Sequence, residues 1–178
     1  MKTTQDRHAA EARFRTVFSH LGAVAAYARR RGNGDADALA AEVMTIAWRR
    51  LADVPLDDPR PWLFATARNL VLADARRSSA AAGDAGDRGA VVPASEVREL
   101  DPALRLALRS LSRLEREALL LVAWEDLTPS QAARSLGINP AAFRVRLLRA
   151  RRRLRAKLDD ASTGRRRDPK ANLDMETT

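Results

Sequence analysis

The stretch LTPSQAARSLGINPAAFRVRLLRARRRLRAKL, residues 127–158, decides how the second half of the chain folds. Thr128 and Asn139 are good N-cap residues, and each is followed by proline, so two successive helices are predicted. Gly137 between them suits a turn with positive φ, and Ala133 is small enough to let two helices approach. The pattern therefore predicts a helix, a tight turn and a longer helix.

The longer helix is predicted to have two different faces. The window 144–157 holds eight lysines and arginines and no acid. A buried stripe with a cationic outer face is what a reader of the DNA major groove needs, since the charges bind phosphates and the N-terminal side chains reach base edges. A solvated basic helix, or one that pairs with a partner's acids, is the alternative, but the capped helix and glycine turn before it favour DNA contact. The residues expected in the buried stripe are Phe143, Leu147, Ala150 and Leu154.

Composition favours an all-α fold with a polyanionic partner. The 178 residues are 46% hydrophobic but only 4% aromatic, which suits small helical modules. The net charge of +9 fits nucleic acid or an acidic membrane surface, although arginine-rich coding bias would give the same value. The chain has no cysteine, which excludes disulfides and thiolate metal sites. Residues 1–25 lack a signal-peptide pattern and the apolar run 118–124 is too short to cross a bilayer, so we expect a cytoplasmic protein without membrane insertion.

Helix and linker signals divide the chain into two domains. Apolar residues at helical spacing predict one helix over 9–31 and another over 37–51, and a third is expected to begin after Asp58 as its cap. Residues 78–100 are rich in Ala, Gly, Ser and Asp without a period, which predicts a flexible linker. The predicted organisation is a helical domain over 9–77, a linker over 78–100, a helix–turn–helix domain over 101–160 and a disordered tail over 161–178.

Capping signals open the second domain. Asp101 precedes a proline and is expected to cap the first helix. The sequence SRLE that follows pairs Ser112 with Glu115 in a predicted capping box, in which each residue satisfies a free backbone N–H of the other. These caps predict where the helices of this domain begin.

With both domains laid out, the chain resembles the extracytoplasmic-function (ECF) group of bacterial sigma factors. In the second domain the resemblance rests on residues 108–158, which look like the family's domain that binds the minus-35 promoter element. In the first domain it rests on DADALAAEVMTIAWRRL (35–51) and RPWLFATARNLVLADARR (60–77), which look like the polymerase-binding and minus-10 segments. The resemblance implies an alternative sigma factor that directs transcription initiation. It implies core RNA polymerase, promoter DNA and an anti-sigma factor as partners, with no cofactor, metal or small-molecule substrate.

The resemblance also implies which residues carry each contact. Trp62 matches the first aromatic of a pair that wedges at melted DNA, and Leu63 at the second position implies weaker melting and stricter promoter choice. A surface of Trp62, Asn69 and Arg76, spaced by seven, suits stacking on single-stranded DNA, although a tryptophan near a helix start also fits a core role. The implied sites are Asp37, Leu39, Glu42 and Val43 for polymerase; Trp62, Arg68, Asn69, Arg76 and Arg77 for the minus-10 element; and Gln131, Asn139, Arg144, Val145, Leu148 and Arg149 for the minus-35 element.

The sequence departs from the family at several of these places. Ala38 stands where an acid is usual, Ala41 where glutamine is common, and Met44 where an aromatic is common. Clamp binding by the polymerase segment therefore rests on pattern more than on individual contacts. On the recognition helix, Val145 occupies a position often filled by a small polar residue, and Arg152, Arg153 and Arg155 are expected to meet only phosphates or solvent.

The sequence also bears on other classes of function. An enzyme is disfavoured, because the two histidines lack metal-ligand spacing and no phosphate loop or nucleophile elbow is present. A response regulator carries a similar helix–turn–helix, but it needs an α/β receiver domain, and residues 1–77 show no strand pattern. A sigma-like decoy, which binds polymerase or an anti-sigma factor without initiating transcription, stays open on sequence alone.

Overall fold

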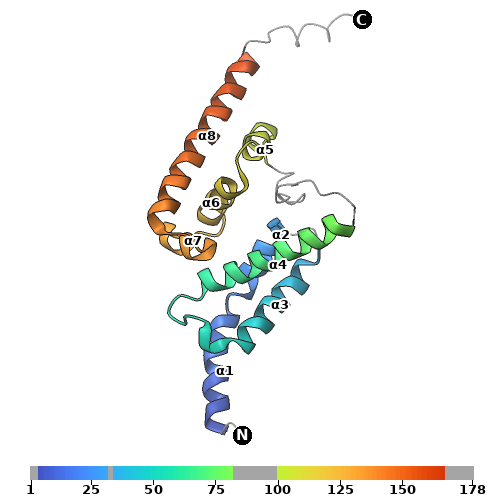
Figure 1. Ribbon diagram of the computed structural model, residues 1–178, viewed down its shortest axis with the longest axis vertical. Coiled ribbons are helices and arrows are strands. Elements are labelled where there is room, and N and C mark those ends of the chain that lie inside the picture. The colour runs from blue at the N-terminus through green and yellow to red at the C-terminus, as the bar shows by residue number, and fades with distance from the viewer. Residues whose placement is uncertain (1–3, 32–33, 82–99, 167–178) are drawn as a thin grey trace, which may run out of the picture.

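The computed structural model describes residues 4–31, 34–81 and 100–166, which form helices joined by short turns (Figure 1). The predicted all-α class is confirmed for these ranges. None of the helices in them combines the length and apolarity that a bilayer-crossing segment requires. The first domain contains α1 (Thr4–Phe18), α2 (Leu21–Arg31), α3 (Ala36–Arg49), the 3-10 turn η1 (Leu51–Asp53) and α4 (Arg60–Ala81), and the second contains α5 (Pro102–Arg109), α6 (Arg113–Ala123), α7 (Pro129–Leu136) and α8 (Pro140–Arg166).

The first helical segment is broken where the sequence predicted a continuous helix over 9–31. The Ser19 hydroxyl donates to the Thr16 carbonyl at 2.7 Å, and the His20 amide donates to the Val17 carbonyl at 3.1 Å. A serine that bonds to a nearby carbonyl offers the backbone an alternative to the next helical turn. Phe18 is the last residue of α1, directly before the break, and it is 48% exposed.

Side-chain caps fix the starts of α3 and of the helices of the second domain. The Asp35 carboxylate accepts from the amides of Asp37 and Ala38, so α3 begins at Ala36. The predicted capping box of Ser112 and Glu115 is confirmed at the start of α6. Asp58, the expected cap of α4, bonds instead to side chains of α7, and α4 begins at Arg60.

The helix–turn–helix of the second domain has the predicted turn. Gly137 has φ of 64°, and the amide of Ile138 donates to the carbonyl of Ala133 at 3.0 Å, which closes the end of α7. Ala133 is fully buried, as a close approach of α7 and α8 requires. Phe143, Leu147 and Ala150 are also buried, and α8 packs with them against α5, α6 and α7.

The last helix is longer than the sequence predicted. α8 continues to Arg166, so residues 161–166 are helical and the predicted disorder of the tail is wrong there. The hydroxyls of Ser162 and Thr163 donate to the carbonyls four residues earlier, at 2.8 and 2.9 Å. The hydroxyl groups of these polar residues are therefore satisfied within the helix. Residues 167–178 lie outside the described part of the chain.

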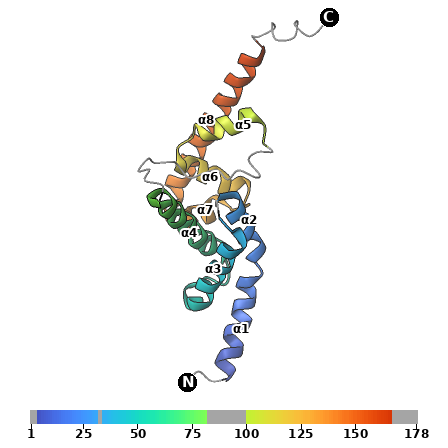
Figure 2. The same cartoon turned by 90° about the vertical axis from the view of Figure 1, so that its right-hand side faces the viewer.

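The two domains pack directly against each other. α4 lies against α7, and Figures 1 and 2 both show α7 next to α4. Buried residues of the two domains form one continuous apolar cluster. Of the predicted linker, residues 78–81 belong to α4, and 82–99 lie outside the described residues. The sequence predicted domains on a tether and gave no sign of this contact.

Candidate nucleic-acid interface

The start of α8 presents an exposed, cationic face. Arg144 and Arg149 are exposed, and between them Val145 and Leu148 are 48% and 50% exposed. Phe143, one position before Arg144, is fully buried in the domain. The helix is thus held by its apolar stripe while this outer surface, which we call the α8 face, stays open to a ligand. DNA contact by its four residues stays a prediction, but the exposure that it needs is present.

Two further residues expected at the minus-35 element have structural roles here. Asn139 caps α8, because its side-chain oxygen accepts from the amide of Ala141 at 2.8 Å. The Gln131 side chain accepts from the amide and the hydroxyl of Thr128 at 2.9 and 3.0 Å, which completes a second capping box. Its Nε2 donates to Asp58 of the first domain at 3.0 Å. The spacing TPSQ is itself a capping-box pattern, so the sequence held the signal for this role.

Arg153 is part of the fold, so the prediction that it meets only phosphates or solvent is wrong. Its guanidinium donates to both carboxylate oxygens of Glu115 at 2.9 Å. Burial alone would raise the pKa of Glu115, but hydrogen bonds from Ser112 and the charge of Arg153 lower it below its usual value. This ion pair joins the middle of α8 to the start of α6.

The residues expected at the minus-10 element lie along α4 in two different environments. Asn69, Arg76 and Arg77 are exposed, and Arg77 pairs with Asp74 on the same helix. Trp62 is half-buried against the core, so both the stacking and the core interpretations keep support. The guanidinium carbon of Arg50 lies 5.9 Å from the Trp62 ring centroid, which places a cation beside the ring.

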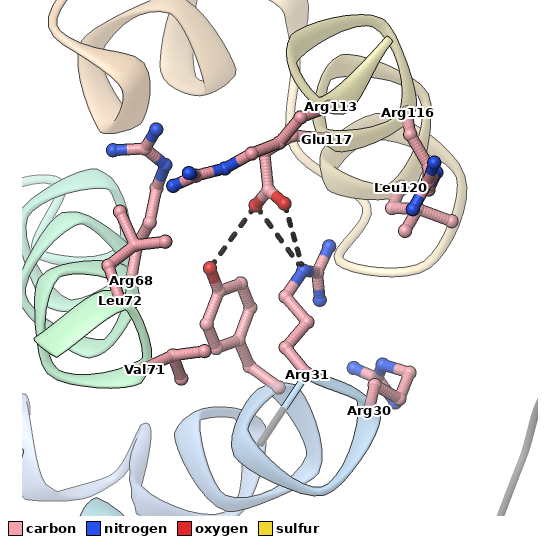
Figure 3. A pocket seen from close by; sticks show the side chains of 10 residues that line it. Arg30, Arg31, Arg68, Val71, Leu72, Arg113, Arg116, Glu117 and Leu120 are labelled. Carbon is pink, nitrogen blue, oxygen red and sulfur yellow. Dashed lines mark hydrogen bonds and ion pairs between the residues drawn. The ribbon is translucent and has the colours of Figure 1, made fainter. Parts of the chain in front are cut away.

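Arg68, the remaining residue of that set, lines a small cavity between the domains (Figure 3). Arginines from α2, α4 and α6 surround the carboxylate of Glu117, which accepts from the Tyr27 hydroxyl at 3.2 Å and from Arg31 Nε at 3.4 Å. Burial and the Glu117 charge raise the pKa of Tyr27 well above its usual value. The cavity has a volume of about 30 Å³, far below the few hundred Å³ of a typical small-molecule site.

The charge of Arg31 is stabilised in this interdomain environment. Burial alone would lower the pKa of its guanidinium, but the carboxylates of Glu117 and Glu125 more than offset this effect, and the pKa is raised. Arg31 therefore stays charged although its side chain is only 6% exposed.

The residues expected at the polymerase surface fall into an exposed pair and a buried pair. Asp37 and Glu42 are exposed on α3, whereas Leu39 and Val43 are 8% and 0% exposed in the core. In this structure Leu39 and Val43 cannot touch a partner, because their helical spacing serves the packing of α3. The sequence did not predict a role for Trp48, which is 45% exposed and is not among the residues expected at the polymerase surface.

Trp48 belongs to an exposed apolar groove between α1 and α3. Its ring meets the Phe14 ring edge-on, with centroids 5.1 Å apart, and Phe18 lies 5.8 Å from Phe14. Glu11 and Arg15 complete the lining. Elsewhere in the described ranges, no group of three His, Asp or Glu side chains gathers as a metal site would require.

The fold and the α8 face define a class: in the described ranges the protein is all-helical, and its second domain is a helix–turn–helix of the kind that binds DNA. Residues 102–154 match the family described as Sigma-70, region 4. The resemblance to sigma factors of the ECF group is confirmed by this match and by solved structures of such proteins.

Three solved structures are similar over most of the chain. The sigma factor RpoE from Bartonella quintana, in complex with the anti-sigma factor NepR, is 25% identical with a TM-score of 0.60, over 82% of this chain and 95% of that one. CnrH, in complex with the cytosolic domain of CnrY, is 26% identical with a TM-score of 0.54, over 84% and 89%. The PhyRSL–NepR complex from Sphingomonas sp. Fr1 shares the fold at 20% identity and a TM-score of 0.58, over 81% and 87%. No curated protein sequence matches the chain.

Proposed function

We propose that the chain binds core RNA polymerase and directs it to promoters that carry minus-10 and minus-35 elements. The role is non-enzymatic: the protein positions polymerase and contributes no chemistry of its own. The α8 face is assigned to the minus-35 element in the major groove, and the exposed side of α4, with Asn69, Arg76 and Arg77, to the minus-10 element. Since core polymerase and the chromosome are the partners, the site of action is the cytoplasm.

The α8 face is the observation that carries this proposal. A helix of a helix–turn–helix whose buried side fixes it to the domain, and whose first turns expose arginine and apolar side chains, suits direct base readout. Arginine is suited to guanine, and Val145 to the methyl group of thymine. With Gln131 and Asn139 used as caps, the proposed readers are Arg144, Val145, Leu148 and Arg149.

Polymerase binding is assigned to the exposed side of the first domain. Asp37 and Glu42 on α3 supply acidic contacts, and the apolar groove of Phe14, Phe18 and Trp48 supplies contact area on the same domain. An anti-sigma factor is a further proposed partner, because RpoE was solved with the anti-sigma factor NepR.

Run-off transcription tests the proposal. Core polymerase should transcribe from a subset of promoters only when the chain is added, and Arg144→Ala should reduce this activity while the control Arg105→Ala, on α5, should not. A chain that binds core polymerase in a pull-down but gives no promoter-specific transcript would be a decoy. Glu42→Lys should weaken the pull-down, and unchanged binding would move the polymerase surface elsewhere.

A further inference from the structure

One donor of Arg31 is buried without a partner. Arg31 is 7% exposed, and its Nε and Nη1 atoms donate to Glu117 and Glu125 at 3.4 and 2.6 Å. Its Nη2 atom is also buried, and it has no hydrogen-bond partner among the residues that the structure describes. Buried polar atoms are nearly always hydrogen-bonded in folded proteins, so this atom is available to a small ligand in the cavity that Arg31 lines.

Two further arginines from different helices line the same cavity. Arg68 belongs to α4 and Arg113 to α6, and Figure 3 shows both side chains ending on the same side of the Glu117 carboxylate. Neither guanidinium makes a hydrogen bond or an ion pair with another residue in the described ranges. A guanidinium has N–H donors and no acceptor, so these two groups can be satisfied in the cavity only by an anion or by water.

The cavity has an excess of positive charge. Its lining contains one acid, Glu117, and five arginines: Arg30, Arg31, Arg68, Arg113 and Arg116. Glu125 supplies a second carboxylate at one end, where it pairs with Arg30 and Arg31 at 2.5 and 2.6 Å. Tyr27 stays neutral, because burial and the Glu117 charge raise its pKa well above its usual value. Two carboxylates therefore face five guanidinium groups, which favours an anion over a water molecule.

The volume of the cavity restricts the ligand to a single small ion. About 10–15 Å³ is enough to hold one water molecule, and this cavity measures about 30 Å³. A monatomic ion fits this space. A polyatomic anion such as phosphate brings several heavy atoms and needs more room, and a nucleotide or an organic acid needs more still.

We propose that the cavity binds one chloride-sized monovalent anion, which accepts hydrogen bonds from Arg31 Nη2 and from the guanidinium groups of Arg68 and Arg113. This site goes beyond the proposed function and does not rest on it. Binding satisfies the unpaired donor and reduces repulsion among the arginines, so the anion stabilises the folded chain. Glu117 opposes binding, because its carboxylate repels the anion and limits the affinity.

Broadening of the chloride NMR signal by the full chain measures the binding. Arg68→Met and Arg113→Met keep an unbranched side chain and remove its charge, so each should raise the Kd for chloride about tenfold or more. Arg49→Met is the matched control: Arg49 is exposed on α3 and does not line the cavity, so the Kd should not change. Glu117→Gln should lower the Kd several-fold, because it removes the repelling charge. Circular dichroism checks that each variant keeps its helical signal.

Stability and crystallography give independent readouts. At constant ionic strength, replacing gluconate, which is too large for the cavity, with chloride should raise the unfolding midpoint of the parent by about 2–4 °C and leave that of Arg113→Met unchanged. Crystals grown in bromide should show an anomalous peak within hydrogen-bond distance of Arg31 Nη2. Ordered water there without bromide, or equal Kd values for the parent and both arginine variants, would overturn the proposal. These measurements use neither polymerase nor DNA, so their outcome is separate from that of the proposed function.

Discussion

Arg153 Nη1 lies 2.9 Å from both carboxylate oxygens of Glu115, so the most arginine-rich helix of the chain is tied to α6 by one of its own cations. The Glu115 side chain is 7% exposed and that of Arg153 is 63% exposed, so the acid is the buried partner. The pair shows that the positive charges of α8 are not equivalent. Some are available to a polyanion, and at least this one serves the fold.

Arg153→Ala is expected to destabilise the folded protein. Loss of the guanidinium removes two charge-assisted hydrogen bonds from a buried carboxylate, which should lower the free energy of unfolding by roughly 1–3 kcal/mol. The exposed neighbour Arg152 is the matched control. Arg152→Ala should change the free energy of unfolding by less than about 0.5 kcal/mol. Urea unfolding followed by circular dichroism measures both. Equal stability of the two variants would mean that the pair contributes nothing in solution.

Glu115 should make stability depend on pH in the acid range. Its folded pKa lies below its usual value of 4.5, so its contribution is fully present above pH 4.5. The contribution is lost as the pH falls through the lower folded pKa, because the carboxylate must then be protonated in the folded state too. The difference in free energy of unfolding between the parent and Glu115→Gln should shrink steadily as pH is lowered to about 2. A constant difference across this range would contradict the assignment.

The sequence predicted what depends on local signals and missed what depends on distant contacts. The caps at Asp101, Ser112 and Thr128, and the glycine turn, follow from neighbouring residues and were found. The α8 face follows from helical spacing and was found too. Helical spacing places Leu39 on the apolar face of its helix, where it is buried, and only the resemblance assigned it to a partner surface. The exposed position of Trp48 beside Phe14 of α1 depends on a contact between two helices, which periodicity within one helix cannot show.

The contacts between the two domains were still harder to predict from local sequence signals. Glu125 bonds to residues more than ninety positions earlier, and an acid after an apolar run gives no sign of such a partner. Asp58 had a satisfactory local explanation as a helix cap, and the structure uses it across the domain interface. For such charged residues, a plausible local role in the sequence concealed a partner in the other domain.

Among the described glycines, substitution of Gly137 should lower stability most, because its backbone has a positive φ. No heavy atom would lie within 4 Å of an added Cβ, so only the positive φ of 64° opposes a side chain. Gly137→Ala should cost about 1–2 kcal/mol of folding free energy, and Gly137→Asn less. Gly22 is the control, since it lies in α2 with equal space and no positive φ, and Gly22→Ala should be neutral or stabilising. Thermal unfolding of the three variants gives the comparison.

Trp62 should matter for DNA melting. Trp62→Ala should reduce open-complex formation, since base–aromatic stacking contributes roughly 1–3 kcal/mol per base, and a pre-melted template should restore much of the activity. Trp62→Phe keeps an aromatic ring at this position and should retain most of the open-complex formation. Because the side chain is half-buried, circular dichroism of Trp62→Ala is the control. An unfolded variant would make Trp62 a core residue, and the melting role would be withdrawn.

The α8 face should separate base readout from phosphate binding. Arg144 lies in the first turns of α8 beside Val145, where side chains can reach base edges, whereas Arg152 lies two turns further along the helix. Arg144→Ala should cost about 1–3 kcal/mol on the preferred minus-35 sequence and relax the preference at one base pair. Arg152→Ala should weaken binding to all sequences alike and reduce the slope of log K against log salt by about 1. Arg152 is chosen over Arg153 because it makes no ion pair with the part of the chain that the structure describes, so loss of binding is not confused with loss of stability. Selection from a randomised minus-35 library with each variant is the measurement. If Arg144→Ala selects the same sequences as the parent, α8 acts as a cationic clamp, and promoter choice must come from α4.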